Sequence, residues 1–383
     1  MSGAPVVPGL RQRARAAVAP VPWRDLLASW LVARVVVLSA LLTAQFLRQE
    51  LMVRHGYRLP HYSLLGWDAS WYDRIAQHGY ALEPQQALRF FPLVPLLARA
   101  LGILLLGHDG IALLLLANGG ALVLGALLHR LALSEGLGKA AARRAVWALA
   151  FAPAAFVLVM GYSEAVYGVL VVGCLLALRR QQWAVAAVLA ALTGASRPTG
   201  VLLAVPALVE GVRGLRSAGA RQCLLRGAAV AAPAAGLLAY LGWVQVRFGD
   251  YRLPFSVQEK AGLRGGLIAN TPHEIVRSLS RLPTRLDATL VHLPWLVLSL
   301  VLFVVVVRRL PRSLAAYTAA GLLLASTGHL LGSFERYAAA TPPLLLAAGL
   351  VTGGATRSRV VLAGAAGLLS AYAFLAFIVL YTP

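Results

Sequence analysis

Long runs of Leu, Val and Ala, separated by short polar segments, follow one another from about residue 26 to the end of the chain. One of them, "LLLLANGGALVLGALL", covers 113–128 with no charged residue. A helix needs about 20 mostly apolar residues to cross a bilayer, and the runs near 26–47 and 110–133 reach that length. This pattern predicts an all-α polytopic membrane protein.

Composition supports this interpretation. Hydrophobic residues make up 59% of the 383 and charged residues only 13%, whereas a soluble domain carries about 25% charged residues. Most of the net charge of +21 comes from arginine, since Lys139 and Lys260 are the only lysines. In a membrane protein such an excess faces anionic lipid from cytoplasmic loops, so nucleic acid is not an expected partner. We expect a basic cytoplasmic tail at 1–25 and one transmembrane unit at 26–383.

The basic segments set the topology through the positive-inside rule. If the tail is cytoplasmic, the first span leads out and 48–109 forms a large extracytoplasmic loop. The later clusters "LRRQQ", "RRLPR" and "TRSR" then all fall inside. The resulting count is about eleven spans with the N-terminus in, the C-terminus out, and a second large outer loop at 248–287.

Two segments need special treatment for this count to hold. The segment 90–107 contains Pro92, Pro95 and Arg99, which suits an interfacial or re-entrant helix better than a span. The segment 183–211 is too short for two full spans, yet the arginine pattern requires a hairpin that turns at "SRPTG". Two half-helices beside a polar cavity would satisfy both conditions.

The distribution of acidic residues indicates that the functional site lies on the extracytoplasmic side. Eleven of the fourteen fall outside or at the outer edge on this map, although acidic residues contribute little to topology itself. The segment "GWDASWYDRIAQHGY" at 66–80 places Asp68 and Asp73 among aromatic residues in the first outer loop. As a helix it would carry Trp67, Trp71 and Ile75 on one stripe and end at Gly79. An inert interfacial anchor explains this composition as well as a catalytic loop does.

Other polar positions also have two interpretations. Glu164 could be a helix N-terminal acid with Ser163 as the cap. Arg197, at the hairpin tip, would either reach the headgroups or bind a phosphate. Glu335 could simply pair with Arg336, and Arg34 is expected to extend to the cytoplasmic headgroups.

The absence of several nucleotide- and metal-binding motifs narrows the range of reactions that the sequence supports. The chain has no G-x-G-x-x-G, no Walker A sequence and no D-x-D pair. His61 and His78 lie near the two aspartates, but no compact ligand motif joins them. We therefore expect no metal and no cofactor, and a donor that is available outside and soluble in the bilayer.

The ordered motifs "WDASWYDRIAQHGY", "FFPLVPLL", "GYSEAVYGVL", "SRPTGVLL" and "ERYAAATPPLLL" resemble the PIG-V-like family of mannosyltransferases, within the GT-C superfamily of polyprenyl-phosphate-sugar-dependent glycosyltransferases. The resemblance covers about 60–350 and implies a GT-C-like fold with interfacial helices in the first outer loop. It also implies an extracytoplasmic active site in the cell membrane and a polyprenyl-phosphate mannose donor. The catalytic acid of the family falls on Asp68, which would act as general base in an inverting displacement.

The same resemblance implies cationic contacts to the leaving phosphate, for which Arg197, Arg336 and Lys260 are the outer candidates. Further substrate contacts are expected from Trp71, Tyr72, His78, Glu164, Gln258 and Tyr337. The acceptor would be an envelope glycolipid or another extracytoplasmic molecule. Two other functions stay open: a flippase for lipid-linked sugars that uses the same arginines, and an envelope assembly protein without catalysis.

Overall fold

A computed structural model describes residues 20–55, 63–260, 275–277, 280, 288–327 and 331–381. Over these ranges the chain is built from helices, turns and short connections, with no strand, so the all-α prediction is confirmed for the part described. The α-helices are α2 (Trp23–His55), α3 (Asp68–His78), α4 (Leu93–Leu104), α5 (Asp109–Ser134), α6 (Gly138–Phe151), α7 (Glu164–Arg179), α8 (Trp183–Ser196), α9 (Ala204–Gly211), α10 (Ala220–Phe248), α11 (Leu253–Lys260), α13 (Ala288–Arg309), α14 (Arg312–Ala325), α15 (Phe334–Ala339), α16 (Pro342–Val351) and α17 (Ala355–Phe377). The 3-10 helices are η1 (Tyr80–Leu82), η2 (Gln85–Arg89), η3 (Pro153–Leu158), η4 (Pro198–Leu203) and η5 (Leu215–Ser217).

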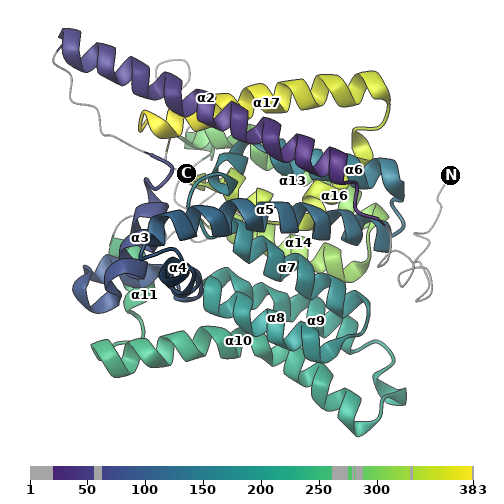
Figure 1. Ribbon diagram of the computed structural model, residues 1–383. Helices are drawn as coiled ribbons and strands as arrows, with labels where there is room; N and C mark the ends of the chain where they lie inside the picture. The colour runs from purple at the N-terminus through teal and green to yellow at the C-terminus, as the bar shows by residue number, and fades with distance from the viewer. Residues whose placement is uncertain are drawn as a thin grey trace.

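Five of the described helices are long and apolar enough to cross a membrane: α2, α5, α10, α13 and α17. They lie roughly along one common direction (Figure 1). Their outer surfaces remain apolar, as at Leu42 and Val246, which are 65% and 89% exposed. A surface of this kind suits hydrocarbon rather than water, and the membrane character expected from the sequence is therefore supported.

The bundle packs mainly through neighbouring helices. The most extensive contacts are those of α8 with α10, α5 with α7, α7 with α8, α6 with α16, and α2 with α17. Small residues allow the first of these contacts, because a Cβ added at Gly236 of α10 would lie 1.9 Å from the carbonyl oxygen of Ala191 in α8. Close backbone approach through small residues is typical of helix packing in membranes.

The segment 183–211 forms the hairpin that the arginine pattern required. Helix α8 ends at Ser196, and η4 and α9 return beside α10. Both ends of the hairpin meet Arg226, whose guanidinium lies 5.2 Å from the Trp183 ring and donates to the carbonyl oxygen of Gly211. Each arm is about 14 residues, or about 21 Å of helix, which is shorter than a hydrocarbon core of about 30 Å.

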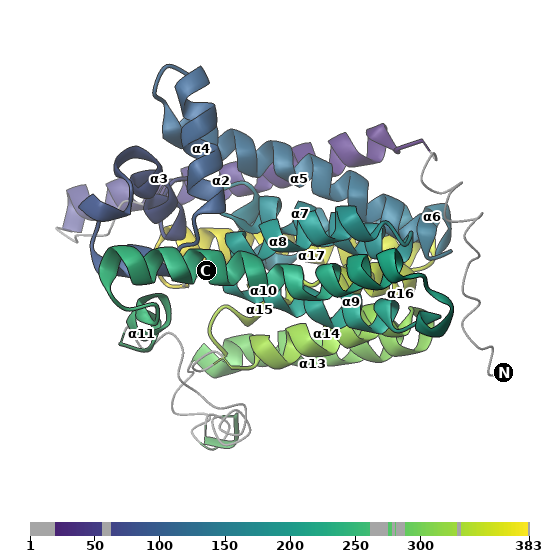
Figure 2. The same cartoon turned by 90° about the horizontal axis from the view of Figure 1, so that it is seen from below.

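Helices α3, α4 and α11 gather at one end of the bundle, called here the α3 end (Figure 1). Helix α4, within the segment 90–107, runs across the direction of the long helices (Figure 2). It exposes Leu96, Ile103 and Leu104 by 61%, 69% and 78%. Twelve residues with one apolar exposed face fit an interfacial helix better than a span.

One prediction about the spans is wrong. Arg34 does not reach the headgroups, because its side chain is buried between α2, α5 and η3. Its Nη2 donates to the carbonyl oxygen of Leu158 at 2.9 Å, and its Nε donates to Oδ1 of Asn118 at 3.0 Å. The carbonyl at the end of η3 gives this arginine an interior partner, which a hydrophobic pattern does not reveal.

Candidate functional site

Helix α3 forms most of the segment 66–80, in which Asp68 and Asp73 lie among aromatic residues. It begins at Asp68 and ends before Gly79, whose φ of +72° suits glycine. The predicted stripe of Trp67, Trp71 and Ile75 is not the buried face: the buried residues of the helix are Ala69, Tyr72, Ile75 and Ala76. Trp67 precedes the helix, and its φ of +56° is not helical. It therefore does not continue the row of side chains formed by Trp71 and Ile75.

Two contacts fix the start of α3 against the bundle. The indole N–H of Trp67 donates to the carbonyl oxygen of Ala376 in α17 at 2.9 Å. The backbone N–H of Asp68 donates to the hydroxyl of Tyr162 at 3.3 Å. The Asp68 side chain keeps 28% of its surface exposed, so its carboxylate remains reachable by another molecule.

Four charged residues from four distant segments meet beside this carboxylate. We call Asp68, Glu164, Arg197 and Arg336 the site cluster. Nη1 of Arg336 lies 2.8 Å from Oδ2 of Asp68, and its Nε lies 3.4 Å from Oε1 of Glu164. Nη1 of Arg197 lies 2.5 Å from the same Oε1. The formal charges of the cluster cancel, and Asp68 is its most exposed member.

Aromatic rings enclose the two arginines. The guanidinium of Arg197 lies 5.5 Å from the Tyr167 ring and 5.7 Å from the Tyr337 ring. Arg336 lies 5.6 Å from the same Tyr337 ring and 5.7 Å from Tyr162. Cation–π contacts of this kind help to hold a guanidinium away from water. Arg197 therefore does not reach toward headgroups, and the first of its two sequence interpretations is wrong.

Tyr72 joins α3 to the start of α7. Its hydroxyl donates to Oγ of Ser163 at 2.9 Å. Burial raises the pKa of Tyr72, so the hydroxyl stays protonated and able to donate. Ser163 precedes α7 but makes no capping hydrogen bond with its side chain, so its predicted role as the cap of Glu164 is wrong.

Glu335 does not pair with Arg336, contrary to the expectation from their adjacency. It points to a different group, where Nδ1 of His292 lies 2.7 Å from Oε1 and the Tyr381 hydroxyl donates to Oε2 at 3.1 Å. Both His292 and Glu335 are buried. Consecutive residues of a helix point about 100° apart, so Glu335 and Arg336 face different neighbours. Sequence reasoning missed His292, which stands alone in an apolar run with no polar pattern to mark it.

Several predicted contact residues lie away from the site cluster. His78 is half-exposed and pairs with Glu83 at 3.2 Å. Trp71 stacks on Phe90, with ring centroids 5.8 Å apart. Gln258 lies on α11, which packs against η2, and no hydrogen bond to the cluster is described for it. The side chain of Lys260 and all of His61 fall outside the described residues.

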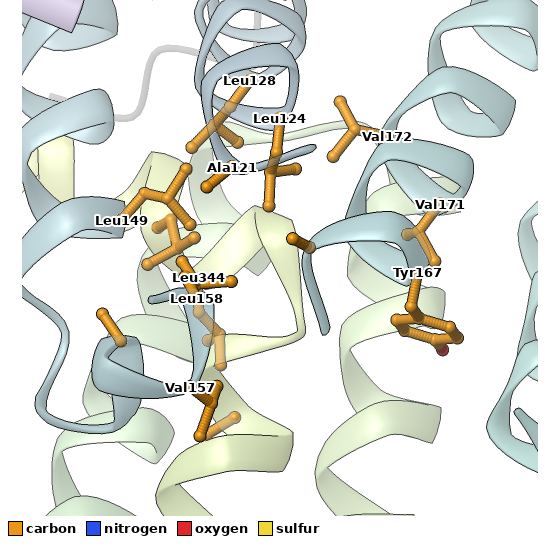
Figure 3. Close-up of a cluster of buried hydrophobic side chains, with 14 of the residues drawn as sticks. Ala121, Leu124, Leu128, Leu149, Val157, Leu158, Tyr167, Val171, Val172 and Leu344 are labelled. Carbon is orange, nitrogen blue, oxygen red and sulfur yellow. The ribbon is translucent and has the colours of Figure 1, made fainter. Parts of the chain in front are cut away.

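A cavity extends from the site cluster into the bundle, and we call it the inner cavity. Its accessible volume is about 30 Å³, room for about one or two water molecules, within about 480 Å³ of space between atoms that includes open solvent. Its walls come from α5, α6, η3, α7, α15 and α16, and its charged members are Glu164 and Arg336. The remaining wall is apolar: Leu124, Leu128, Leu149 and Leu158 face the same interior (Figure 3).

The arrangement brings a partly exposed carboxylate, two arginines and an apolar space together in one place. A carboxylate can accept a proton from a hydroxyl, and guanidinium groups bind phosphate oxygens. Within the described ranges, no three side chains of His, Cys, Asp or Glu gather as a ligand set, and the expectation that no metal takes part stays a prediction. No model of a known protein family matches the chain, and comparison with curated protein sequences finds no match.

Proposed function

We propose that the chain is an integral-membrane glycosyltransferase that moves a sugar, mannose by the family resemblance, from a polyprenyl-phosphate donor to an extracytoplasmic acceptor. The observation that carries the proposal is the site cluster. The motifs that carry the family resemblance contain residues 68, 164, 197 and 336, and the charged side chains of these residues meet within hydrogen-bond or ion-pair distance.

Asp68 acts as general base in this proposal. Its carboxylate takes the proton of the acceptor hydroxyl while the hydroxyl oxygen forms a bond to the anomeric carbon of the sugar. The bond from that carbon to the phosphate oxygen breaks, and polyprenyl phosphate leaves with the electron pair. One carboxylate is enough for such an inverting displacement, and general bases contribute about 10²–10⁴-fold to rate.

Arg336 and Arg197 stabilise the leaving phosphate. Both are enclosed by rings and paired with carboxylates, so the donor phosphate has to share these guanidinium groups. Arg336 offers five N–H donors in a fixed plane, and only some of them point at Asp68 and Glu164. We place the cluster on the extracytoplasmic side of a fold with about eleven spans, as the arginine pattern requires.

The Asp68→Asn variant tests this function. It keeps the shape of the side chain and removes the base, so transfer from radiolabelled polyprenyl-phosphate mannose to membrane acceptors should fall by about 10²-fold or more. Expression and thermal stability in detergent serve as the folding control. Unchanged transfer by a folded variant would show that Asp68 is not the base. Donor movement across vesicles without any product would favour a flippase.

A further inference from the structure

Two consecutive arginines at the end of α7 have different surroundings. The helix begins at Glu164 of the site cluster, and Arg180 follows its last residue, Arg179, about 24 Å further along the axis. Arg179 holds Glu135 through Nε and Nη2, at 2.8 and 2.9 Å. These two nitrogens form one edge of the guanidinium group, which matches the two oxygens of an oxyanion. The same edge of Arg180 is buried and makes no hydrogen bond to any described residue.

A second arginine, Arg130 of α5, lies close to Arg180. Helix α5 packs along α7 (Figures 1 and 2). Burial lowers the pKa of Arg180, and the positive charge of Arg130 lowers it further, which requires a short distance between them. Nε of Arg130 is also buried without a hydrogen bond to the described chain. We call these two residues the arginine pair. Buried donors without acceptors and neighbouring like charges both cost free energy, and a bound anion removes both costs.

The acidic residues at this end of the bundle already have other partners. Glu135 and Glu210 contact Arg179 at 2.8 and 2.6 Å. Asp25 lies 3.4 Å from Arg143. These are the three acidic residues that the arginine pattern of the sequence places on the inner side. The described chain therefore supplies no carboxylate to the arginine pair, and an oxyanion of another molecule has to fill that role.

The surroundings of the arginine pair indicate a lipid as the source of this oxyanion. Val123 of α5 is 50% exposed on the apolar surface, and Arg130 lies seven residues, or about two turns, further along the same face. Arg130 is four residues from the end of this membrane-spanning helix, which is the depth of lipid head groups. On the other side, α8 exposes Val185 by 50%, five residues after Arg180. A molecule bound here therefore has hydrocarbon-facing surfaces on both sides.

We propose that Arg130 and Arg180 bind the phosphate group of an anionic phospholipid in the leaflet at this end of the bundle. Two phosphate oxygens accept from the Nε and Nη2 edge of Arg180, and Arg130 adds a second positive charge. A zwitterionic lipid carries the same phosphate, but the arginine pair repels its cationic head group. The arginine pattern places this end in the cytoplasm, where the leaflet is rich in anionic lipid. The site is separate from the site cluster, so neither proposal depends on the other.

Lipid binding to the full-length protein tests this inference. Native mass spectrometry of the protein in detergent measures the affinity for dioleoyl phosphatidylglycerol, and a parallel titration uses dioleoyl phosphatidylcholine. We expect the first phosphatidylglycerol to bind about tenfold more tightly than the first phosphatidylcholine, since hydrogen bonds between charged groups are stronger than neutral ones. Equal affinity for the two lipids would overturn the proposal.

Matched variants separate a specific site from general positive charge. Arg180→Gln and Arg130→Gln should each weaken phosphatidylglycerol binding by about tenfold. Arg221→Gln removes the same charge from the exposed start of α10 and should change the affinity by no more than about twofold. An equal loss in Arg180→Gln and Arg221→Gln would show that the lipid responds to overall charge, and the site would be refuted.

Thermal unfolding in the same detergent separates binding from folding. Without lipid, Arg180→Gln should be at least as stable as the unmodified protein, because it removes buried donors and a like-charge contact. A marked loss of stability would instead give Arg180 a partner within the protein and refute the proposal. Phosphatidylglycerol should raise the unfolding temperature of the unmodified protein but not of the variant. Inorganic phosphate at the same concentration should have no such effect; an equal rise would identify free phosphate as the ligand and refute a lipid.

Discussion

At the residue scale, Arg336 is the link between the two carboxylates of the site cluster. It reaches Asp68 through Nη1 and Glu164 through Nε, on two sides of one planar group. Lysine has a single ammonium and cannot take both positions at once. The geometry thus depends on the identity of this residue and not only on its charge.

Replacement by lysine tests that dependence. Arg336→Lys should lower transfer by about tenfold or more, since loss of a placed donor commonly costs 10²–10³ in rate. Initial rates with the radiolabelled donor measure the effect. Arg74→Lys is the matched control, because Arg74 is more exposed and pairs with Glu83 outside the cluster. Equal rates for both variants would remove Arg336 from the mechanism.

At the element scale, the contact between α8 and α10 supports the hairpin whose tip carries Arg197. The two helices approach so closely that Gly194 and Gly236 face backbone atoms of the partner helix. A side chain at either position would push the hairpin away from α10. Arg197 would then move relative to Glu164, so helix packing and site geometry are coupled.

Paired glycine substitutions in α10 measure this contact. Gly236→Ala should destabilise the protein by about 1–3 kcal/mol, because its Cβ meets the Ala191 carbonyl oxygen at 1.9 Å. Gly242→Ala adds the same methyl group where nothing lies within 4 Å, and should be neutral or stabilising by up to ~1 kcal/mol. Unfolding in detergent compares the two. Equal stability would contradict the close packing.

At the scale of the whole molecule, a second buried charged group joins four helices at the end of α7 opposite to Glu164. Arg179 of α7 binds both carboxylate oxygens of Glu135 at 2.8 and 2.9 Å and Oε1 of Glu210 at 2.6 Å. Ser313 of α14 donates to Glu210 as well. These contacts connect the ends of α5, α7 and α9 to α14, and the arginine is 1% exposed.

Loss of Arg179 should therefore affect the entire fold. Arg179→Met leaves the buried carboxylate of Glu135 without its cation and leaves Glu210 with Arg213 alone, and should destabilise the protein by about 3–5 kcal/mol. Arg221→Met, on the exposed start of α10, gives the matched control and should change little. Thermal unfolding of both variants in the same detergent provides the comparison. A small effect at Arg179 would mean that water reaches the two acids.

Sequence reasoning could predict the outline of the fold and many of the candidate residues. Long hydrophobic runs and a low share of charged residues predicted the all-α class, and the arginine spacing required the hairpin at 183–211 that the structure contains. The resemblance of the ordered motifs to a known family indicated Asp68, Glu164, Arg197 and Arg336. The helical class and the hairpin depend on segment length, hydrophobicity and local charge, which are properties of the sequence itself.

Only the tertiary structure decided which charges meet. Adjacency suggested that Glu335 pairs with Arg336, but the helix directs them to different partners, His292 and Asp68. Arg34 donates to a carbonyl oxygen in the interior of the bundle. His292 pairs with the buried Glu335, and no sequence pattern predicted this contact. The inner cavity and the approach of Arg130 to Arg180 also arise from how helical segments pack. Such pairings join residues many positions apart, so they follow from packing in three dimensions and not from local pattern.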